Sequence, residues 1–240
     1  MVPHRRAIGG AVLHGHGGVV ITGHNVARKH GQVTTVLLAN ERRSTHTHFN
    51  DLCTDGVGRI YVGLVDLDAH RSDRRRARSI ISLIDTDGSV QVVDEFGVDA
   101  ANGIAPSIDG RLLYVCDTFG ETVWQFDVHT DGTLANRRPL VHWDERAGPD
   151  GLALTESGDI CVALHFAGCV ALIDPDGAEK RRLAVPGPPT SVCFGGTSLD
   201  VLYITTASSP GERNGGAFSV LDEGPGNAVP LAAVRGESGS

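Results

Sequence analysis

Short runs of alternating hydrophobic and polar residues, separated by tight turns, make up most of this chain. Alternation with a period of two residues predicts β-strands that have one buried face. Short continuous apolar runs, at residues 60–64, 112–115 and 160–164, also predict strands. The Asp-Gly pair at residues 87–88 lies between two apolar runs, which is a strong signal for a β-hairpin. No helical periodicity of useful length occurs, so the pattern predicts an all-β fold.

The strands recur as a larger unit, in which a polar residue precedes a strand, a turn and a second strand. The polar residues of four successive units are Asn50, Asn102, Asp150 and Thr190. The inner hairpins of the units are marked by Gly18, Gly58, Gly110, Gly158 and a position near Asp200. Subtraction gives spacings of 40, 52, 48 and about 42 residues. One blade of a β-propeller takes about 40–50 residues and has four strands.

This repeat predicts a β-propeller of four-stranded antiparallel blades, of which about five are visible in the sequence. A two-sheet β-sandwich is the alternative, and the near-constant repeat argues against it. We expect a single domain over residues 1–222. We expect residues 223–240 to form a tail that is flexible at its end, because this stretch is rich in Gly, Ser and Glu.

Composition limits which partners the protein is expected to bind and in which cellular compartment it is expected. The formal net charge of -8 disfavours nucleic acid, and the basic run at residues 71–78 is predicted to be a solvated loop. The five cysteines include no Cys-x-x-Cys pair, which favours free thiols in a reducing compartment. Neither an apolar leader segment nor a run of about 18 apolar residues occurs. We therefore expect a cytoplasmic protein without a membrane partner, and the sequence leaves its oligomeric state open.

Four motifs at the starts of the units carry a further signal. They are Phe49-Asn50-Asp51, Asn102-Gly103, Pro149-Asp150-Gly151-Leu152 and Thr190-Ser191-Val192-Cys193-Phe194-Gly195-Gly196. These motifs resemble those of the gluconolactonase/regucalcin (senescence marker protein) family, over roughly residues 7–222. Members of that family are six-bladed propellers. They hold a divalent metal, often Ca²⁺, on the propeller axis and hydrolyse lactones or related esters.

The resemblance implies a role for several residues of this sequence. The family's two metal-binding residues that precede a Gly correspond to Asn102 and Asp150. Its substrate-contacting Asn corresponds to Asn50, and the Arg two residues earlier is replaced by His48, which has fewer hydrogen-bond donors. An acidic substrate-binding residue corresponds to Asp68. The family's N-terminal Glu ligand has no counterpart, because the chain begins where the family's second blade begins. We therefore expect a site that lacks one carboxylate.

These residue types suit a hard cation, because Ca²⁺ and Mg²⁺ prefer oxygen ligands. Ca²⁺ is the expected cofactor, with Mg²⁺, Mn²⁺ and Zn²⁺ as alternatives. Asp150 is expected to be both a ligand and a general base, while the metal polarises a lactone carbonyl. Each motif taken singly is equally well explained as a turn, and their matching places in successive blades favour a site. A transition-metal site at His46 and His48, which share one side of an extended strand, is a less favoured interpretation.

The sequence therefore predicts a metal-dependent hydrolase whose partner is a small-molecule lactone or cyclic ester. One alternative is a non-catalytic propeller that binds Ca²⁺ or a small ligand, or that serves as a platform for other proteins. Another is a biosynthetic enzyme that uses the same axial pocket. The absent Glu favours the binding protein, whereas Asn50, Asn102 and Asp150 favour the hydrolase.

Overall fold

The strands of the protein form five antiparallel sheets. The computed structural model describes residues 8–41, 47–66, 79–95, 97–208, 211, 215–221 and 224–236. Within these ranges the chain forms strands and turns but no helix. Four of the sheets have four strands each, and the last has three. Every paired strand follows its partner directly in the sequence, so each sheet is a simple meander.

Each sheet begins with its innermost strand and ends with its outermost strand. The first sheet comprises β1 (Ala11–Leu13), β2 (Val19–Ile21), β3 (Val26–His30) and β4 (Val33–Leu38). The second comprises β5 (Thr47–Thr54), β6 (Ile60–Asp66), β7 (Ile80–Ile84) and β8 (Val90–Glu95). The third comprises β9 (Ala101–Pro106), β10 (Leu112–Asp117), β11 (Thr122–Val128) and β12 (Leu134–His142). The fourth comprises β13 (Pro149–Leu154), β14 (Ile160–Leu164), β15 (Cys169–Ile173) and β16 (Glu179–Ala184). The fifth comprises β17 (Pro189–Gly195), β18 (Val201–Thr206) and β19 (Gly216–Leu221).

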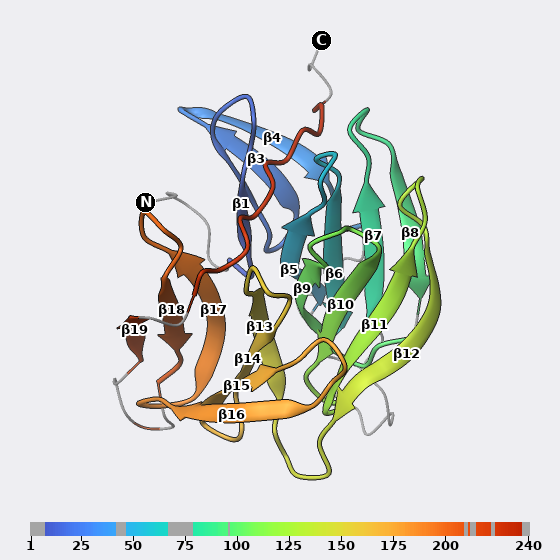
Figure 1. Ribbon diagram of the computed structural model, residues 1–240. Coiled ribbons are helices and arrows are strands. Elements are labelled where there is room, and N and C mark those ends of the chain that lie inside the picture. The colour runs from blue at the N-terminus through green and yellow to red at the C-terminus, as the bar shows by residue number, and fades with distance from the viewer. Residues whose placement is uncertain are drawn as a thin grey trace.

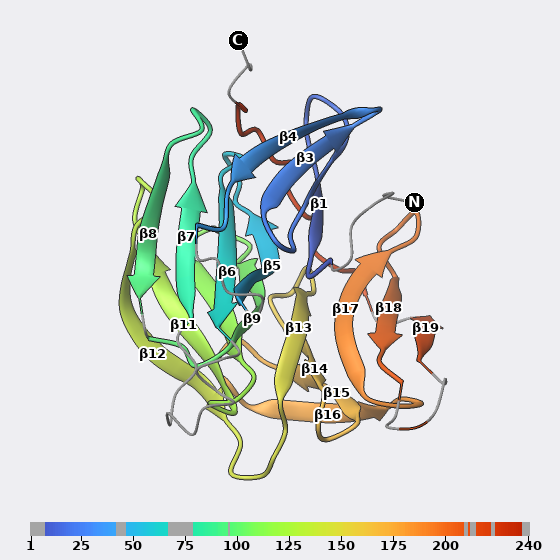
Figure 2. The same ribbon diagram turned by 180° about the vertical axis from the view of Figure 1, so that it is seen from behind.

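The five sheets are arranged as the blades of a propeller around a common axis (Figures 1 and 2). The inner strands β5, β9, β13 and β17 contact one another in that order. The hydrophobic core is divided into four clusters, and each cluster fills the space between two neighbouring blades. The strands β6, β7 and β14 have continuous apolar runs because both faces of their sheets are buried. The prediction of an all-β propeller is confirmed, with five blades.

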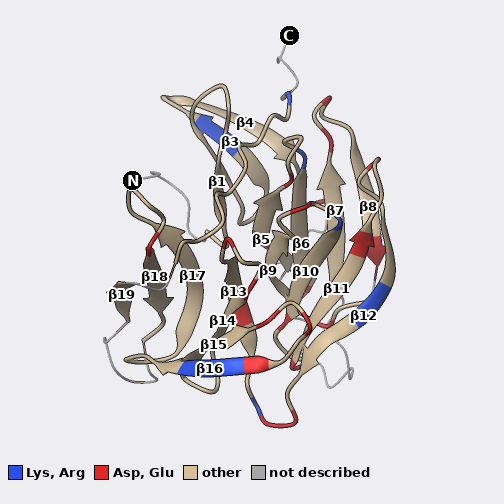
Figure 3. Ribbon diagram, viewed as in Figure 1, with Lys and Arg blue, Asp and Glu red and all other residues tan. Residues whose placement is uncertain are grey.

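Charged side chains lie mainly on the outer strands and in the loops (Figure 3). The outer strand β16 shows this best, because its residues from Glu179 to Arg182 are all exposed. Four of the five cysteines are buried. All five are free thiols, as expected. In the described part of the chain, no helix exists that could cross a membrane.

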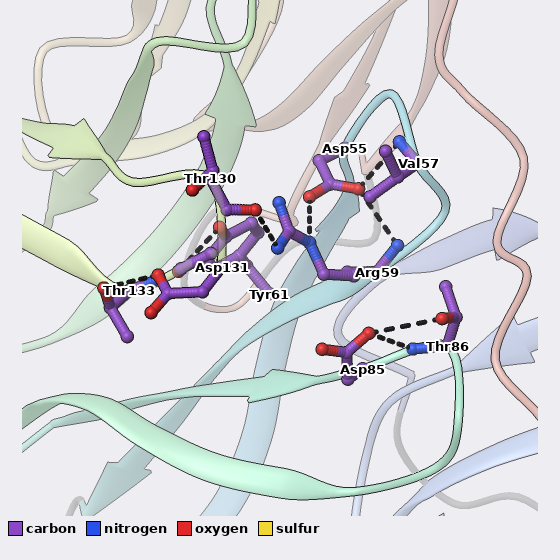
Figure 4. Close-up of polar contacts among 10 residues, drawn as sticks. Asp55, Val57, Arg59, Tyr61, Asp85, Thr86, Thr130, Asp131 and Thr133 are labelled. Carbon is purple, nitrogen blue, oxygen red and sulfur yellow. Dashed lines mark hydrogen bonds and ion pairs between the residues drawn. The ribbon is translucent and has the colours of Figure 1, made fainter.

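A buried ion pair within the second blade is hydrogen-bonded to the third blade (Figure 4). Arg59 Nε donates to Asp55 Oδ2 over 2.6 Å, and Arg59 Nη1 donates to the Thr130 carbonyl over 3.0 Å. The Tyr61 hydroxyl donates to the carbonyl of Gly132 in the same hairpin of the third blade over 2.8 Å. These contacts fix the angle between the two blades by directed hydrogen bonds as well as by apolar packing.

Residues 224–236 cross the C-terminal ends of the inner strands (Figure 1). The N–H of Asn227 donates to the Leu154 carbonyl over 2.8 Å, and the N–H of Ala232 donates to the Leu13 carbonyl over 2.9 Å. The N–H of Ala233 donates to the Gly58 carbonyl over 2.8 Å. We call this stretch the C-terminal strap. The N–H of Gly226 also donates to the Leu199 carbonyl over 2.8 Å, so the strap ties the fifth, fourth, second and first blades together at one end of the propeller.

Candidate functional site

Four inner strands carry the same irregularity near their N-terminal ends. In β5, β9, β13 and β17 one extra residue interrupts the pairing with the next strand of the blade. Such a β-bulge re-aims the side chains of the bulged residues. The bulges contain the polar residues that the sequence repeat predicts, namely Asn50, Asn102, Asp150 and Thr190. The candidate site therefore lies at the end of the axis opposite to the C-terminal strap.

Asn102 and Asp150 come together at this end of the axis. The Asn102 amide hydrogen-bonds to the Asp150 carboxylate, which lowers the pKa of that carboxylate. The Asn102 Nδ2 also donates to Thr118 Oγ1 over 3.2 Å. Because both bonds engage the amide nitrogen, the Asn102 Oδ1 remains the atom that can accept from a ligand or coordinate a cation. Asn50 joins the group through its Nδ2, which donates to the Ala101 carbonyl over 3.4 Å.

Two glycines allow the inner strands to approach so closely. A Cβ atom on Gly103 would lie 2.4 Å from the Asp150 carbonyl oxygen. A Cβ atom on Gly151 would lie 2.5 Å from the Ser191 Oγ. Real Cβ atoms do not make contacts this short, so both positions require glycine where the strands meet.

Asp51 adds a second carboxylate that the sequence did not single out. Burial raises the pKa of Asp51 to about 7, although the backbone N–H groups of Leu52 and Ile104 act to lower it. The Leu52 N–H lies 2.8 Å from Asp51 Oδ1. Asp51 therefore lies between β5 and β9 in a poorly solvated place, where a carboxyl group is more stable protonated than charged.

Asp150 is electrostatically coupled to Asp51. Burial and, as a smaller cause, the negative charge of Asp51 raise the pKa of Asp150 to about 8, against the hydrogen bonds from Asn102 and Gly151. The buried thiol of Cys116 also has a raised pKa, because burial and the charges of Asp150 and Asp51 disfavour its thiolate. A protonated thiol is a poor nucleophile, so the chemistry of this site rests on the carboxyl groups.

Thr118 links the two strands that carry Asn102 and Asp150. Its hydroxyl donates to the Pro149 carbonyl over 2.8 Å and accepts from Asn102 Nδ2. The adjacent Asp117 is buried and accepts hydrogen bonds from the backbone N–H groups of Asp99 and Ala100, each over 3.0 Å. Asp117 and Thr118 therefore hold the segment that leads into β9 against the start of β13.

His165 lies next to Asp150. It directly follows β14, whose last residue Leu164 pairs with Pro149. Its Nδ1 is 3.9 Å from Asp150 Oδ2 and 3.1 Å from the Pro189 carbonyl oxygen. The ring is therefore in contact with the candidate site from the hairpin of the fourth blade.

A cavity of about 290 Å³ extends along the axis from Asp51 towards the C-terminal strap. It is lined by residues of all five inner strands, and residues 227–230 of the strap close its far end. Of the candidate-site residues, Asp51 lines this cavity, whereas Asn50, Asn102 and Asp150 do not line it and lie nearer the N-terminal ends of the inner strands.

The donor set fits a hard divalent cation. Asn102 Oδ1 and the carboxylates of Asp150 and Asp51 offer oxygen atoms, and two desolvated carboxyl groups with raised pKa values would be stabilised by a positive charge. The described residues contain no group of three or more His, Cys, Asp or Glu side chains arranged to hold a metal ion. Such a cation would therefore need amide and water oxygens to complete its coordination.

The structure brings together three of the predicted site residues, namely Asn50, Asn102 and Asp150. His48 is half-buried on β5, two residues before Asn50, and its role in substrate binding stays a prediction. Asp68 and His46 lie outside the described residues.

Sequence reasoning missed Asp51, Thr118 and His165. Asp51 could have been found, because it occupies the bulge position that is glycine in the next two inner strands. Thr118 and His165 each directly follow the second strand of a blade. That second strand pairs with the inner strand, so its end lies beside the bulge.

Comparisons with known proteins agree with this architecture. The sequence model of the SMP-30/Gluconolactonase/LRE-like region matches residues 1–208. Pentonolactonase XacC of Haloferax volcanii is 34% identical over 207 residues, which cover 83% of this chain and 67% of that protein.

Solved structures show the same fold at lower sequence identity. A luciferin-regenerating enzyme has a TM-score of 0.84 at 21% identity, covering 96% of this chain and 83% of that chain. A regucalcin from Agrobacterium tumefaciens, described as a calcium-binding protein, has a TM-score of 0.81 at 20% identity, covering 92% and 78% of the respective chains. The sequence resemblance is thereby confirmed.

Proposed function

Because the chain belongs to the SMP-30/gluconolactonase/LRE-like family, we propose that it is a metal-dependent hydrolase of a lactone or cyclic ester. The observation that carries this proposal is the contact of Asn102 with Asp150, together with the buried carboxyl group of Asp51, whose negative charge acts on Asp150. The similarity to a pentonolactonase supports a small lactone as the substrate.

The cofactor in this proposal is a divalent cation held by Asn102 and Asp150. Ca²⁺ is favoured, because the ligands are oxygen atoms and because the similar Agrobacterium regucalcin is described as calcium-binding. Mg²⁺, Mn²⁺ and Zn²⁺ are the alternatives. A bound cation would supply positive charge that polarises the lactone carbonyl. Asp51 would add a second negative charge close to the cation.

In the proposed reaction, the Asp150 carboxylate accepts a proton from a water molecule while the water oxygen bonds to the lactone carbonyl carbon. The bond between that carbon and the ring oxygen then breaks. Asp150 returns the proton to the leaving ring oxygen, and the product is a hydroxy acid. Asn50 and His48 would orient the substrate through hydrogen bonds. Asp68 is proposed as a further substrate contact.

The test is hydrolysis of a panel of lactones by the purified protein, with a chelator and after addition of each of the four cations. We expect activity to depend on the cation and Asp150→Asn to reduce kcat by at least about 100-fold, because the variant lacks the base. Asp176→Asn is the matched control, because Asp176 is exposed in the turn between β15 and β16. Activity that survives chelation, or that is equal in Asp150→Asn and the control, would rule out this mechanism.

Calorimetry with the same cations separates the hydrolase from the non-catalytic alternative. Cation binding without turnover on any lactone would favour a binding protein or an enzyme with another reaction. Absence of binding heat up to millimolar concentrations of all four cations would contradict the proposed metal site.

A further inference from the structure

The Pro189 carbonyl determines which nitrogen of the His165 ring carries a hydrogen. The Pro189 carbonyl oxygen lies 3.1 Å from Nδ1, and a carbonyl oxygen can only accept a hydrogen bond. Nδ1 therefore carries a hydrogen and donates it. In the neutral ring Nε2 is then a bare acceptor. Among the described residues, no hydrogen-bond donor to Nε2 is found, and the His165 side chain is 28% exposed.

The position of the ring is fixed by its neighbours. The backbone N–H of His165 donates to the Gly148 carbonyl over 2.8 Å. The Phe166 ring packs edge-on against the His165 ring at 5.2 Å between centroids, and the Arg146 guanidinium lies 4.1 Å from the Phe166 centroid. A Cβ atom on Gly148 would lie 2.3 Å from the Phe166 ring, so glycine is required there. The acceptor at Nε2 is therefore held ready before a ligand arrives.

We propose that His165 is a specificity-determining residue of the substrate site, and that its Nε2 accepts a hydrogen bond from a hydroxyl group of a polyhydroxylated lactone bound at Asp150. The inference rests on the proposed function and goes beyond it by assigning a residue that recognises a hydroxyl group of the substrate. A buried or half-buried acceptor selects for substrates with a matching donor, because an analogue without the hydroxyl leaves the acceptor without a partner. The site should therefore prefer sugar lactones to unsubstituted lactones.

Two substitutions separate this role from a merely structural one. His165→Asn keeps an amide N–H near the place of Nδ1, where it can still donate to the Pro189 carbonyl, but it removes the acceptor at Nε2. His165→Gln places an amide oxygen near the place of Nε2 and gives up the bond to Pro189. A structural role predicts greater damage in the Gln variant, whereas the proposed role predicts greater damage in the Asn variant. His129→Asn, an exposed position in the third blade, is the control.

The first readout compares glucono-1,5-lactone with δ-valerolactone, which has no hydroxyl groups. We expect His165→Asn to lower kcat/KM for the hydroxylated lactone by about tenfold, mostly through KM, and to leave δ-valerolactone almost unchanged. His165→Gln should recover part of the loss. Equal effects of both variants on both lactones would overturn the proposal.

The second readout does not need turnover. Calorimetric titration with xylitol, an unreactive polyol, should give weaker binding to His165→Asn than to the wild-type protein and the control. If the wild-type protein hydrolyses neither lactone, the proposed hydrolase function fails, and this titration alone decides the role of His165. Equal xylitol binding by wild-type protein and His165→Asn, or no binding to either, would overturn it.

Discussion

Asp51 occupies the bulge position at which the next two inner strands have Gly103 and Gly151. Glycine is required in those two strands because the following strand leaves no room for a Cβ atom. Asp51 instead extends a carboxyl group, which reaches the backbone N–H of Ile104 on the next inner strand. The presence of aspartate instead of glycine at this bulge position therefore places a second negative charge near Asp150.

This carboxyl pair predicts how stability depends on pH when the cation is absent. In the folded protein the pKa is about 7 for Asp51 and about 8 for Asp150, and the ordinary value is 3.8 for both. Between pH 3.8 and about 8 the folded state therefore binds more protons than the unfolded state. The stability that these bound protons contribute is lost as pH rises through this range. We expect the Tm of chelated protein to fall between pH 5.5 and about 9.

The measurement is thermal unfolding over this pH range in wild-type protein and in Asp150→Asn. The variant should lose less stability with pH, because its amide does not ionise. Addition of Ca²⁺ should raise the Tm of the wild-type protein most at the alkaline end, where both carboxylates are charged. A pH profile that is identical in the two proteins would contradict the coupling of Asp51 and Asp150.

Neighbouring blades are joined by buried polar contacts as well as by apolar packing. The strongest example is Arg59, whose side chain is 10% exposed while that of its partner Asp55 is 8% exposed. Arg59 also reaches the Thr130 carbonyl in the next blade. The exposed pair of Arg111 and Asp109 offers a contrast, because its side chains are 85% and 59% exposed.

This contrast predicts unequal costs for two similar substitutions. Arg59→Ala leaves the Asp55 carboxylate buried without its cationic partner and should lower the free energy of unfolding by about 3–5 kcal/mol. Arg111→Ala removes only a solvated pair and should cost below about 1 kcal/mol. Urea unfolding of the two variants measures both values. Similar midpoints for the two variants would show that the buried pair does not join the blades.

The C-terminal strap ties the first, second, fourth and fifth blades together at one end of the axis, whereas the candidate site lies at the other end. Ala232 and Val234 of the strap are fully buried in the apolar cluster between the first and second blades. The buried ring of His14 adds a hydrogen bond to the Val234 carbonyl over 2.9 Å. The strap therefore adds both apolar burial and directed bonds between blades that are distant in the sequence.

We expect removal of the strap, in a chain that ends at residue 223, to lower the Tm by roughly 10 °C or more, because several hydrogen bonds and two buried side chains are lost. A chain that ends at residue 236 is the control. Below its Tm, the shortened protein should keep the kcat of the full chain, since the site lies at the opposite end of the axis. Val234→Ala provides a milder test if the shortened chain does not fold. An unchanged Tm in both variants would contradict this role of the strap.

The sequence by itself determined the fold class and the positions of the polar residues at the blade tips. Alternation and glycine turns act over a few residues, so they can be seen without knowledge of contacts between distant parts of the chain. The regular spacing of such units then predicts blades, because each unit is one sheet that must bury its faces against its neighbours. Asn50, Asn102 and Asp150 were identified on this basis, through the resemblance of their motifs to a known family.

Only the tertiary structure decided which side chains meet. The contact of His165 with Asp150 depends on the pairing of β13 with β14 and on the approach of β17. Asp51 raises the pKa of Asp150 from a different inner strand, and the largest cause of both raised pKa values is burial, which no local pattern records. The path of the C-terminal strap likewise has no periodic signal, because its backbone bonds to four different blades instead of to one neighbouring strand. These features depend on how the blades pack, and that packing joins residues that are far apart in the chain.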